Sequence, residues 1–220
     1  MEFLELLKTG RPVLLDGGMG TMLQARGLPV GAAPETAALE HPEWLREIHS
    51  AYLDAGSQIV YANTFGANRE KLAHCGRTVA EVVPAAVSVA REAARGRGLV
   101  ALDVGPIGQL LEPTGTLEFE QAVDIFAEVV EAGAAAGADL IAIETMTDLQ
   151  EARAALLAAR EHSSLPVLVT MTYEATGRTF LGCSPACAAL TLEGLGADAI
   201  GVNCSLGPRE MPPLVEELLR

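Results

Sequence analysis

The sequence is poor in aromatic residues and in positive charge. It has one Trp, three Tyr and five Phe in 220 residues, and its 15 Lys and Arg stand against 29 Asp and Glu, a formal net charge of −14. An acidic surface repels phosphate backbones, so this balance argues against nucleic-acid binding. The few aromatic residues are spaced as in a protein core and offer no stacking platform for bases.

Long apolar runs are also lacking, although half of the residues are hydrophobic. The stretch Leu140–Ile143 is typical of the longest runs and is far shorter than the ~20 residues that cross a bilayer. The N-terminus is acidic, where a signal peptide would be basic. Four cysteines are too few for a disulfide scaffold and indicate free thiols in a reducing compartment. We therefore expect a cytoplasmic protein without a membrane partner.

What the sequence does have is a regular alternation of short apolar segments and helical patterns. Continuous runs of Val, Ile and Leu are typical of strands in a parallel sheet that helices cover. The predicted strands are Pro12–Leu15, Gln58–Ala62, Leu99–Asp103, Leu140–Ile143, Pro166–Met171 and Ala199–Val202. The predicted helices include Glu43–Ala55, Leu117–Ala136, Leu149–Glu161 and Ala186–Glu193.

Such alternation is compatible with a doubly wound sheet or with a (β/α)₈ barrel. Polar or small residues follow all six predicted strands, and clusters spread in this way meet at one site only if the sheet curls into a barrel. A dinucleotide-binding fold would concentrate them at one crevice. We therefore predict a TIM-type barrel. It has about six of its eight units, so residues 1–220 are expected to form one barrel domain, truncated at its C-terminal side.

An acidic residue follows both the first and the fourth predicted strand, and two glycines come after the first of these acidic residues. Asp16 precedes Gly17 and Gly18, whose backbone N–H groups are suited to holding a carboxylate. Glu144 ends an apolar strand, where a carboxylate is costly without a partner. If Asp16 and Glu144 face one cavity, they form a site for an ammonium group. A tight turn and a rim ion pair are the alternative interpretations.

Polar residues also follow the second and sixth predicted strands. Asn63 and Thr64 would add neutral hydrogen-bonding groups to the same rim, unless they only form a turn. Cys204 is placed to serve as a metal ligand or as a nucleophile. No histidine follows a predicted strand to act as its base, which weakens the nucleophile hypothesis.

Six motifs then occur in a recognisable order. The chain resembles the homocysteine S-methyltransferase family, and within it the homocysteine-binding module of cobalamin-dependent methionine synthases. The resemblance covers essentially the whole chain. The motifs are Leu-Leu-Asp-Gly-Gly-Met-Gly-Thr, Ala-Asn-Thr-Phe-Gly-Ala-Asn, Asp-Val-Gly-Pro-Ile-Gly, Ile-Glu-Thr-Met-Thr-Asp-Leu, Val-Thr-Met-Thr-Tyr and Gly-Val-Asn-Cys-Ser-Leu-Gly-Pro.

The resemblance implies a barrel that binds homocysteine, activates its sulfur on Zn²⁺ and transfers a methyl group to the thiolate to form methionine. It implies that Asp16 and Glu144 hold the substrate ammonium group, that Gly17 and Gly18 receive the carboxylate, and that Cys204 is a zinc ligand. The implied methyl donor is methylcobalamin, carried on other domains.

One family motif is missing. Two further zinc ligands of the family come from a Gly-Gly-Cys-Cys-Gly segment, and this sequence contains no adjacent cysteine pair. The zinc site is therefore expected to be incomplete, because a catalytic zinc needs about three protein ligands. Two hypotheses follow. The chain is a methyltransferase domain that a partner chain or further domains complete, or it is a non-catalytic amino-acid-binding module or inactive fragment.

Overall fold

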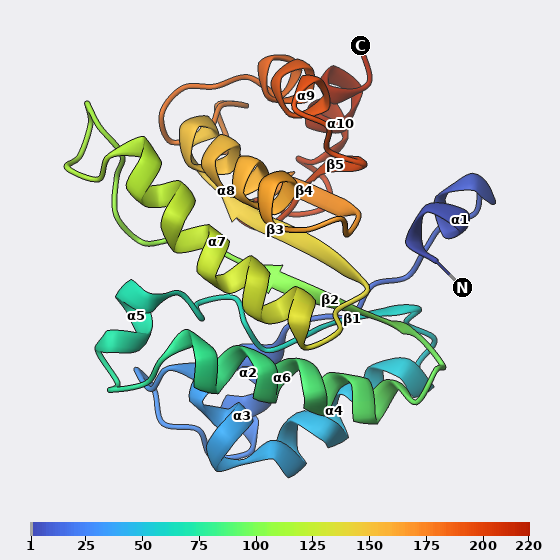
Figure 1. Cartoon of the computed structure of the whole chain (residues 1–220). Coiled ribbons are helices and arrows are strands. Elements are labelled where there is room, and N and C mark those ends of the chain that lie inside the picture. Colours follow the sequence, from blue (N-terminus) through green and yellow to red (C-terminus); the bar gives the residue numbers. More distant parts are fainter. Residues whose placement is uncertain (1) are drawn as a thin grey trace.

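A five-stranded parallel sheet organises the chain. The computed structural model describes residues 2–220 and pairs the strands in chain order, β1-β2-β3-β4-β5 (Figure 1). The strands are β1 (Ile59–Tyr61), β2 (Leu99–Val104), β3 (Leu140–Met146), β4 (Val167–Met171) and β5 (Ala199–Val202). Each strand neighbours its successor, so every connection runs in the same sense, as in a (β/α) barrel.

Helices separate the strands along the chain. The longer ones are α4 (Pro42–Asp54), α6 (Val79–Ala94), α7 (Phe119–Ala135), α8 (Leu149–His162) and α9 (Pro185–Gly194). The shorter ones are α1 (Phe3–Lys8), α2 (Met19–Ala25), the 3₁₀ helix η1 (Pro34–Thr36), α3 (Ala37–Glu40), α5 (Arg69–Ala73) and α10 (Pro212–Leu218). Figure 1 shows α6, α7 and α8 side by side along one face of the sheet.

Strand alternation divides the core into two parts. Side chains such as Val100 and Leu102 belong to the large cluster that the sheet shares with the covering helices. Their neighbour Ala101 belongs to a smaller cluster on the other face, together with Ile59 and Phe3. Because α1 supplies Phe3, this helix covers the smaller cluster beside the ends where the strands begin (Figure 1). The opposite ends of the strands are left for a site.

One extra residue interrupts the pairing of β3 with β4. Ile143 pairs with Val169, but the next pair joins Met146 to Met171. The step between these pairs is therefore three residues on β3 and two on β4. Such a bulge redirects the side chains around it. Here it falls on Glu144 and Thr145, at the C-terminal end of the sheet.

The predicted fold class is confirmed as a partial α/β barrel, and the four predicted helices match α4, α7, α8 and α9 to within two residues. The first predicted strand, Pro12–Leu15, differs. It makes a single parallel bridge, between Leu15 and Ile59, beside β1. Pro12 has no N–H to donate, and the Leu14 N–H is taken by the side chain of Gln58, 3.2 Å away.

This segment and β5 form the two borders of the sheet. Leu14 is 55% exposed, and all four residues of β5 are only partly buried. No helix within residues 2–220 is long and apolar enough to span a membrane.

Candidate active site

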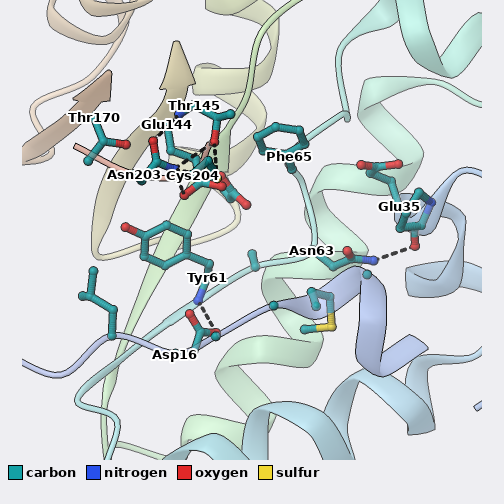
Figure 2. Close-up of a pocket in the computed structure, with 18 of the residues that line it drawn as sticks. Asp16, Glu35, Tyr61, Asn63, Phe65, Glu144, Thr145, Thr170, Asn203 and Cys204 are labelled. Atoms are coloured by element: carbon teal, nitrogen blue, oxygen red, sulfur yellow. Dashed lines mark hydrogen bonds between the residues drawn. The ribbon is translucent and has the colours of Figure 1, made fainter. Parts of the chain in front are cut away.

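A cavity of about 560 Å³ lies at the C-terminal ends of the strands. Six of the seven residues that the sequence singled out line it: Asp16, Gly17, Gly18, Asn63, Glu144 and Cys204. They come from the loop before α2, from the segment after β1, from the end of β3 and from the loop after β5. Figure 2 labels four of them, Asp16, Asn63, Glu144 and Cys204, among the residues drawn around the cavity. The tertiary structure thus brings together residues almost 190 positions apart.

Thr64 is the predicted residue that does not line the cavity. Its hydroxyl accepts the Asp103 N–H at 3.0 Å and donates to the Asp103 carbonyl oxygen at 2.8 Å. Both groups are buried. Thr64 therefore ties the segment after β1 to the end of β2, and its contact is with the backbone of β2 rather than with the cavity.

Asp16 is anchored at the end of β1. Its Oδ2 accepts the backbone N–H of Tyr61 at 2.9 Å, as the dashed line in Figure 2 shows. Burial raises the pKa of the Asp16 carboxyl to about 7, against the opposing effect of the Tyr61 hydrogen bond, and the charge of Glu144 adds to the increase. The carboxyl group is thus held in place, but no cationic side chain among the described residues of the cavity lies beside it.

Gly17 follows Asp16 at a point of close approach. A Cβ at this position would lie 3.0 Å from the Tyr52 hydroxyl oxygen. That hydroxyl in turn donates to the carbonyl oxygen of Gly18 at 3.1 Å. The lack of a side chain at Gly17 therefore lets this turn pack against α4.

Glu144 lines the cavity beside Asn203, the residue that directly follows β5. The side-chain amide of Asn203 donates to Glu144 Oε2 at 3.4 Å and to Thr145 Oγ1 at 2.8 Å. Burial raises the pKa of the Glu144 carboxyl. Like Asp16, this carboxyl is in a place that favours a positively charged partner.

The segment around Cys204 has an unusual backbone. Thr145, Cys204 and Ser205 have φ values of 59°, 55° and 59°, in the left-handed region that L-residues rarely adopt. Thr145 Oγ1 and the Asn203 side-chain nitrogen each lie 3.5 Å from the Cys204 sulfur. Residues with strained backbones are common at functional sites. Here they include Cys204, the one cysteine among the described residues that line the cavity, and two residues next to it.

Asn63 is hydrogen-bonded to the 3₁₀ helix η1, in the loop region between α2 and α3. Its side-chain amide donates to the Pro34 carbonyl oxygen at 2.7 Å. In the next residue of that loop, Glu35 Oε1 accepts the Gly66 N–H at 2.7 Å. These two bonds fix the wall of the cavity that Phe65 also lines.

Asp103 also lines the cavity, although sequence reasoning counted it only as a strand-end residue and gave it no role in the site. The residue is 7% exposed. It stands at the end of a predicted strand, so the rule that selected Asp16 and Glu144 would have selected it too. Tyr61, Phe65 and Thr170 line the cavity as well, but they lie within or directly after apolar strands and give no comparable signal.

The donor groups present do not by themselves fit a zinc ion. Within residues 2–220, no three His, Cys, Asp or Glu side chains are grouped to hold a metal. Cys204 lines the cavity, whereas Cys75, Cys183 and Cys187 do not. A single thiol falls short of the roughly three protein ligands of a catalytic zinc.

Comparisons with known proteins agree on one family. Residues 13–220 match the family described as homocysteine S-methyltransferase. The chain is 34% identical to betaine–homocysteine S-methyltransferase 1 of Sus scrofa, over 93% of this chain and 75% of that protein. It is 32% identical to methionine synthase of Mycobacterium tuberculosis over 96% of its own length, and it spans 19% of that longer protein.

Solved structures share the fold. The metallated form of the homocysteine methyltransferase MmuM from Escherichia coli superposes with a TM-score of 0.86 at 24% identity, covering 98% of this chain and 82% of that one. The family match, the similarity to the Sus scrofa protein and the order of the strand-end motifs lead to one conclusion. The chain belongs to the homocysteine S-methyltransferase family.

Proposed function

We propose that this chain binds homocysteine in the cavity at the strand ends and presents its sulfur for methylation to methionine. The observation that carries the proposal is the arrangement of two carboxyl groups, a glycine turn and one thiol around a single space of about 560 Å³. That volume lies within the range of small-molecule sites. Family membership supports the choice of homocysteine as the ligand.

Each part of the ligand has a matching part of the cavity. The ammonium group is assigned to Asp16 and Glu144, whose partly buried carboxyl groups have no cationic side chain beside them in the part of the chain that the structure describes. The carboxylate is assigned to the backbone N–H groups of Gly17 and Gly18. The sulfur is then directed toward Cys204, on the other side of Glu144.

In this proposal the chain binds zinc only when ligands from outside it complete the site. We assign Cys204 as the one zinc ligand that this chain contributes, and the other ligands to a partner chain or further domains. The similarity to methionine synthases, of which this chain spans 19%, supports such further domains. We assign to them methylcobalamin, the donor that the sequence motifs imply. The assignment of residues 1–220 to one homocysteine-binding barrel domain, and of that domain to the cytoplasm, belongs to the same proposal.

A second function has one observation in its favour. Within the described residues no group of metal ligands is complete, which is also the state expected of an amino-acid-binding module without catalysis. The two functions share the ammonium site and differ in the use of Cys204.

Isothermal titration of the purified chain with homocysteine tests the binding step. Asp16→Asn and Glu144→Gln should each raise the Kd about 10-fold or more, because a hydrogen bond to a charged group contributes roughly 1.5–3 kcal/mol. Asp124→Asn and Glu120→Gln make the same substitutions at exposed positions of α7 and should leave the Kd unchanged. Absence of binding to the wild-type chain, or unchanged affinity in both cavity variants, would refute the proposal.

A further inference from the structure

We propose that Asp103 is a third carboxyl group of the ammonium subsite and makes the cavity selective for ligands with a free α-amino group. The inference rests on the proposed function and extends it to a residue that neither the sequence motifs nor the comparisons assign. Four features of the structure support it: strand order, an unpartnered oxygen atom, a fixed backbone and the balance of charge in the cavity.

Strand order puts Asp103 between the other two carboxyl groups. The Asp16 carboxyl is held at the end of β1 by the N–H of Tyr61, and Glu144 lies on β3. Asp103 belongs to β2, which is paired with both of these strands. A ligand ammonium group that reaches both Asp16 and Glu144 therefore has Asp103 beside it.

One carboxyl oxygen of Asp103 has no protein partner. Asp103 Oδ1 is buried and makes no hydrogen bond to any group in residues 2–220. A buried polar atom in this state costs free energy that a bound donor recovers. The residue is 93% buried and lines the cavity, so we assign a donor group of the bound ligand as the partner of this oxygen atom.

The backbone of Asp103 is held in place by the side chain of Thr64. Thr64 Oγ1 is bonded to both the N–H and the carbonyl oxygen of Asp103. The backbone that carries the carboxyl group is therefore held in place at the cavity wall, which is the support that a binding group needs.

The cavity lacks a positive charge of its own. No Lys, Arg or His is found among the described residues that line it, whereas Asp16, Glu35, Asp103 and Glu144 are all present. Burial and the neighbouring acids Glu144, Asp16 and Glu35 raise the pKa of the Asp103 carboxyl. An ammonium group supplies the balancing charge and has three N–H donors, one for each of Asp16, Asp103 and Glu144.

The decisive experiment compares homocysteine with 4-mercaptobutanoate, which lacks only the amino group. By isothermal titration, the wild-type chain should bind homocysteine at least about 100-fold more tightly than this analogue. Asp103→Asn should weaken homocysteine binding about 10-fold or more and leave the affinity for the analogue unchanged or increased. The ratio of the two Kd values should thus fall, and a purely structural role would not change that ratio.

Two further variants complete the test. Asp124→Asn repeats the substitution at an exposed site on α7 and should leave both Kd values unchanged. Thr64→Val removes the hydroxyl that fixes Asp103 and should lower the Kd ratio in the same direction by a smaller factor, which keeps the proposal testable if Asp103→Asn fails to fold.

The outcomes separate this inference from the function on which it rests. Wild-type protein that does not bind homocysteine overturns the proposed function and the inference together. If Asp16→Asn and Glu144→Gln lose affinity while Asp103→Asn binds as the wild type does, the inference alone fails. Equal loss of affinity for both ligands in Asp103→Asn also overturns it.

Discussion

The side chain of Asn203 holds Thr145 at two points. Its amide nitrogen donates to Thr145 Oγ1 at 2.8 Å, and its carbonyl oxygen accepts the Thr145 N–H at 3.2 Å. Thr145 is β-branched and has a φ of 59°, a conformation that costs of order 1–3 kcal/mol and persists only where surrounding contacts enforce it. The pair therefore fixes the bulge of β3 against the end of β5, with Glu144 and Cys204 on either side.

Replacement of Asn203 should disturb both neighbours of this contact. Asn203→Ala should lower the free energy of unfolding by about 1–3 kcal/mol, because partly buried partners lose their hydrogen bonds. It should also raise the Kd for homocysteine, since Glu144 loses the amide that orients it. Urea denaturation and isothermal titration measure the two effects. Unchanged stability and affinity would contradict the structural role of this pair.

Stability should fall as pH rises from about 4 to about 7. The pKa of Asp16 is about 7 in the folded chain and near 3.9 in an unfolded one, so the folded state binds more protons across this range. The pKa values of Asp103 and Glu144 are shifted in the same direction. The contribution of Asp16 is at most about 4 kcal/mol, because each pKa unit corresponds to ~1.36 kcal/mol.

Thermal unfolding at pH 5 and pH 8 checks this expectation. The wild-type Tm should be lower at pH 8, and Asp16→Asn should reduce the difference between the two values. The exposed control Asp124→Asn loses the same charge and should keep the wild-type difference. A Tm that is equal or higher at pH 8 in the wild-type chain would refute the assignment.

Gly105 leaves room for the aromatic wall of the cavity. Its N–H donates to the Phe65 carbonyl oxygen at 3.0 Å, and a Cβ on Gly105 would lie 2.5 Å from the Phe65 ring. Gly105→Ala should therefore displace Phe65 and cost about 1–3 kcal/mol of stability, the usual range for overpacking. Gly194→Ala is the matched control, since a Cβ at that exposed helical position meets no atom within 4 Å. Urea midpoints should separate the two variants clearly.

Zinc content tests the role assigned to Cys204. Purified from zinc-supplemented medium and dialysed, the chain should retain well under one zinc ion per molecule by elemental analysis, because one thiolate is a weak site. Cys204→Ser should remove the zinc that remains, and Cys75→Ser, at an exposed position outside the cavity, should not. Stoichiometric zinc in the chain alone would show that the ligand set is complete without a partner.

The sequence by itself determined the order of strands and helices and the position of polar residues after the strands. These features depend on local patterns: β-branched apolar runs predict β2, β3 and β4, and the acidic residues at 16 and 144 interrupt apolar segments. The parallel arrangement then follows, because helices connect successive strands.

Only the tertiary structure decided which strand-end side chains face the cavity. The buried strands are apolar on both faces, so the pattern does not reveal which alternate residues point inward. That is why Thr64 was expected in the cavity, and why Asp103, although it ends a predicted strand, was given no role there. The bulge at Glu144 and Thr145 shifts the alternation by one residue, and it arises from pairing between β3 and β4 rather than from either segment alone. Contacts between distant strands, and not local preference, thus placed three carboxyl groups in one cavity.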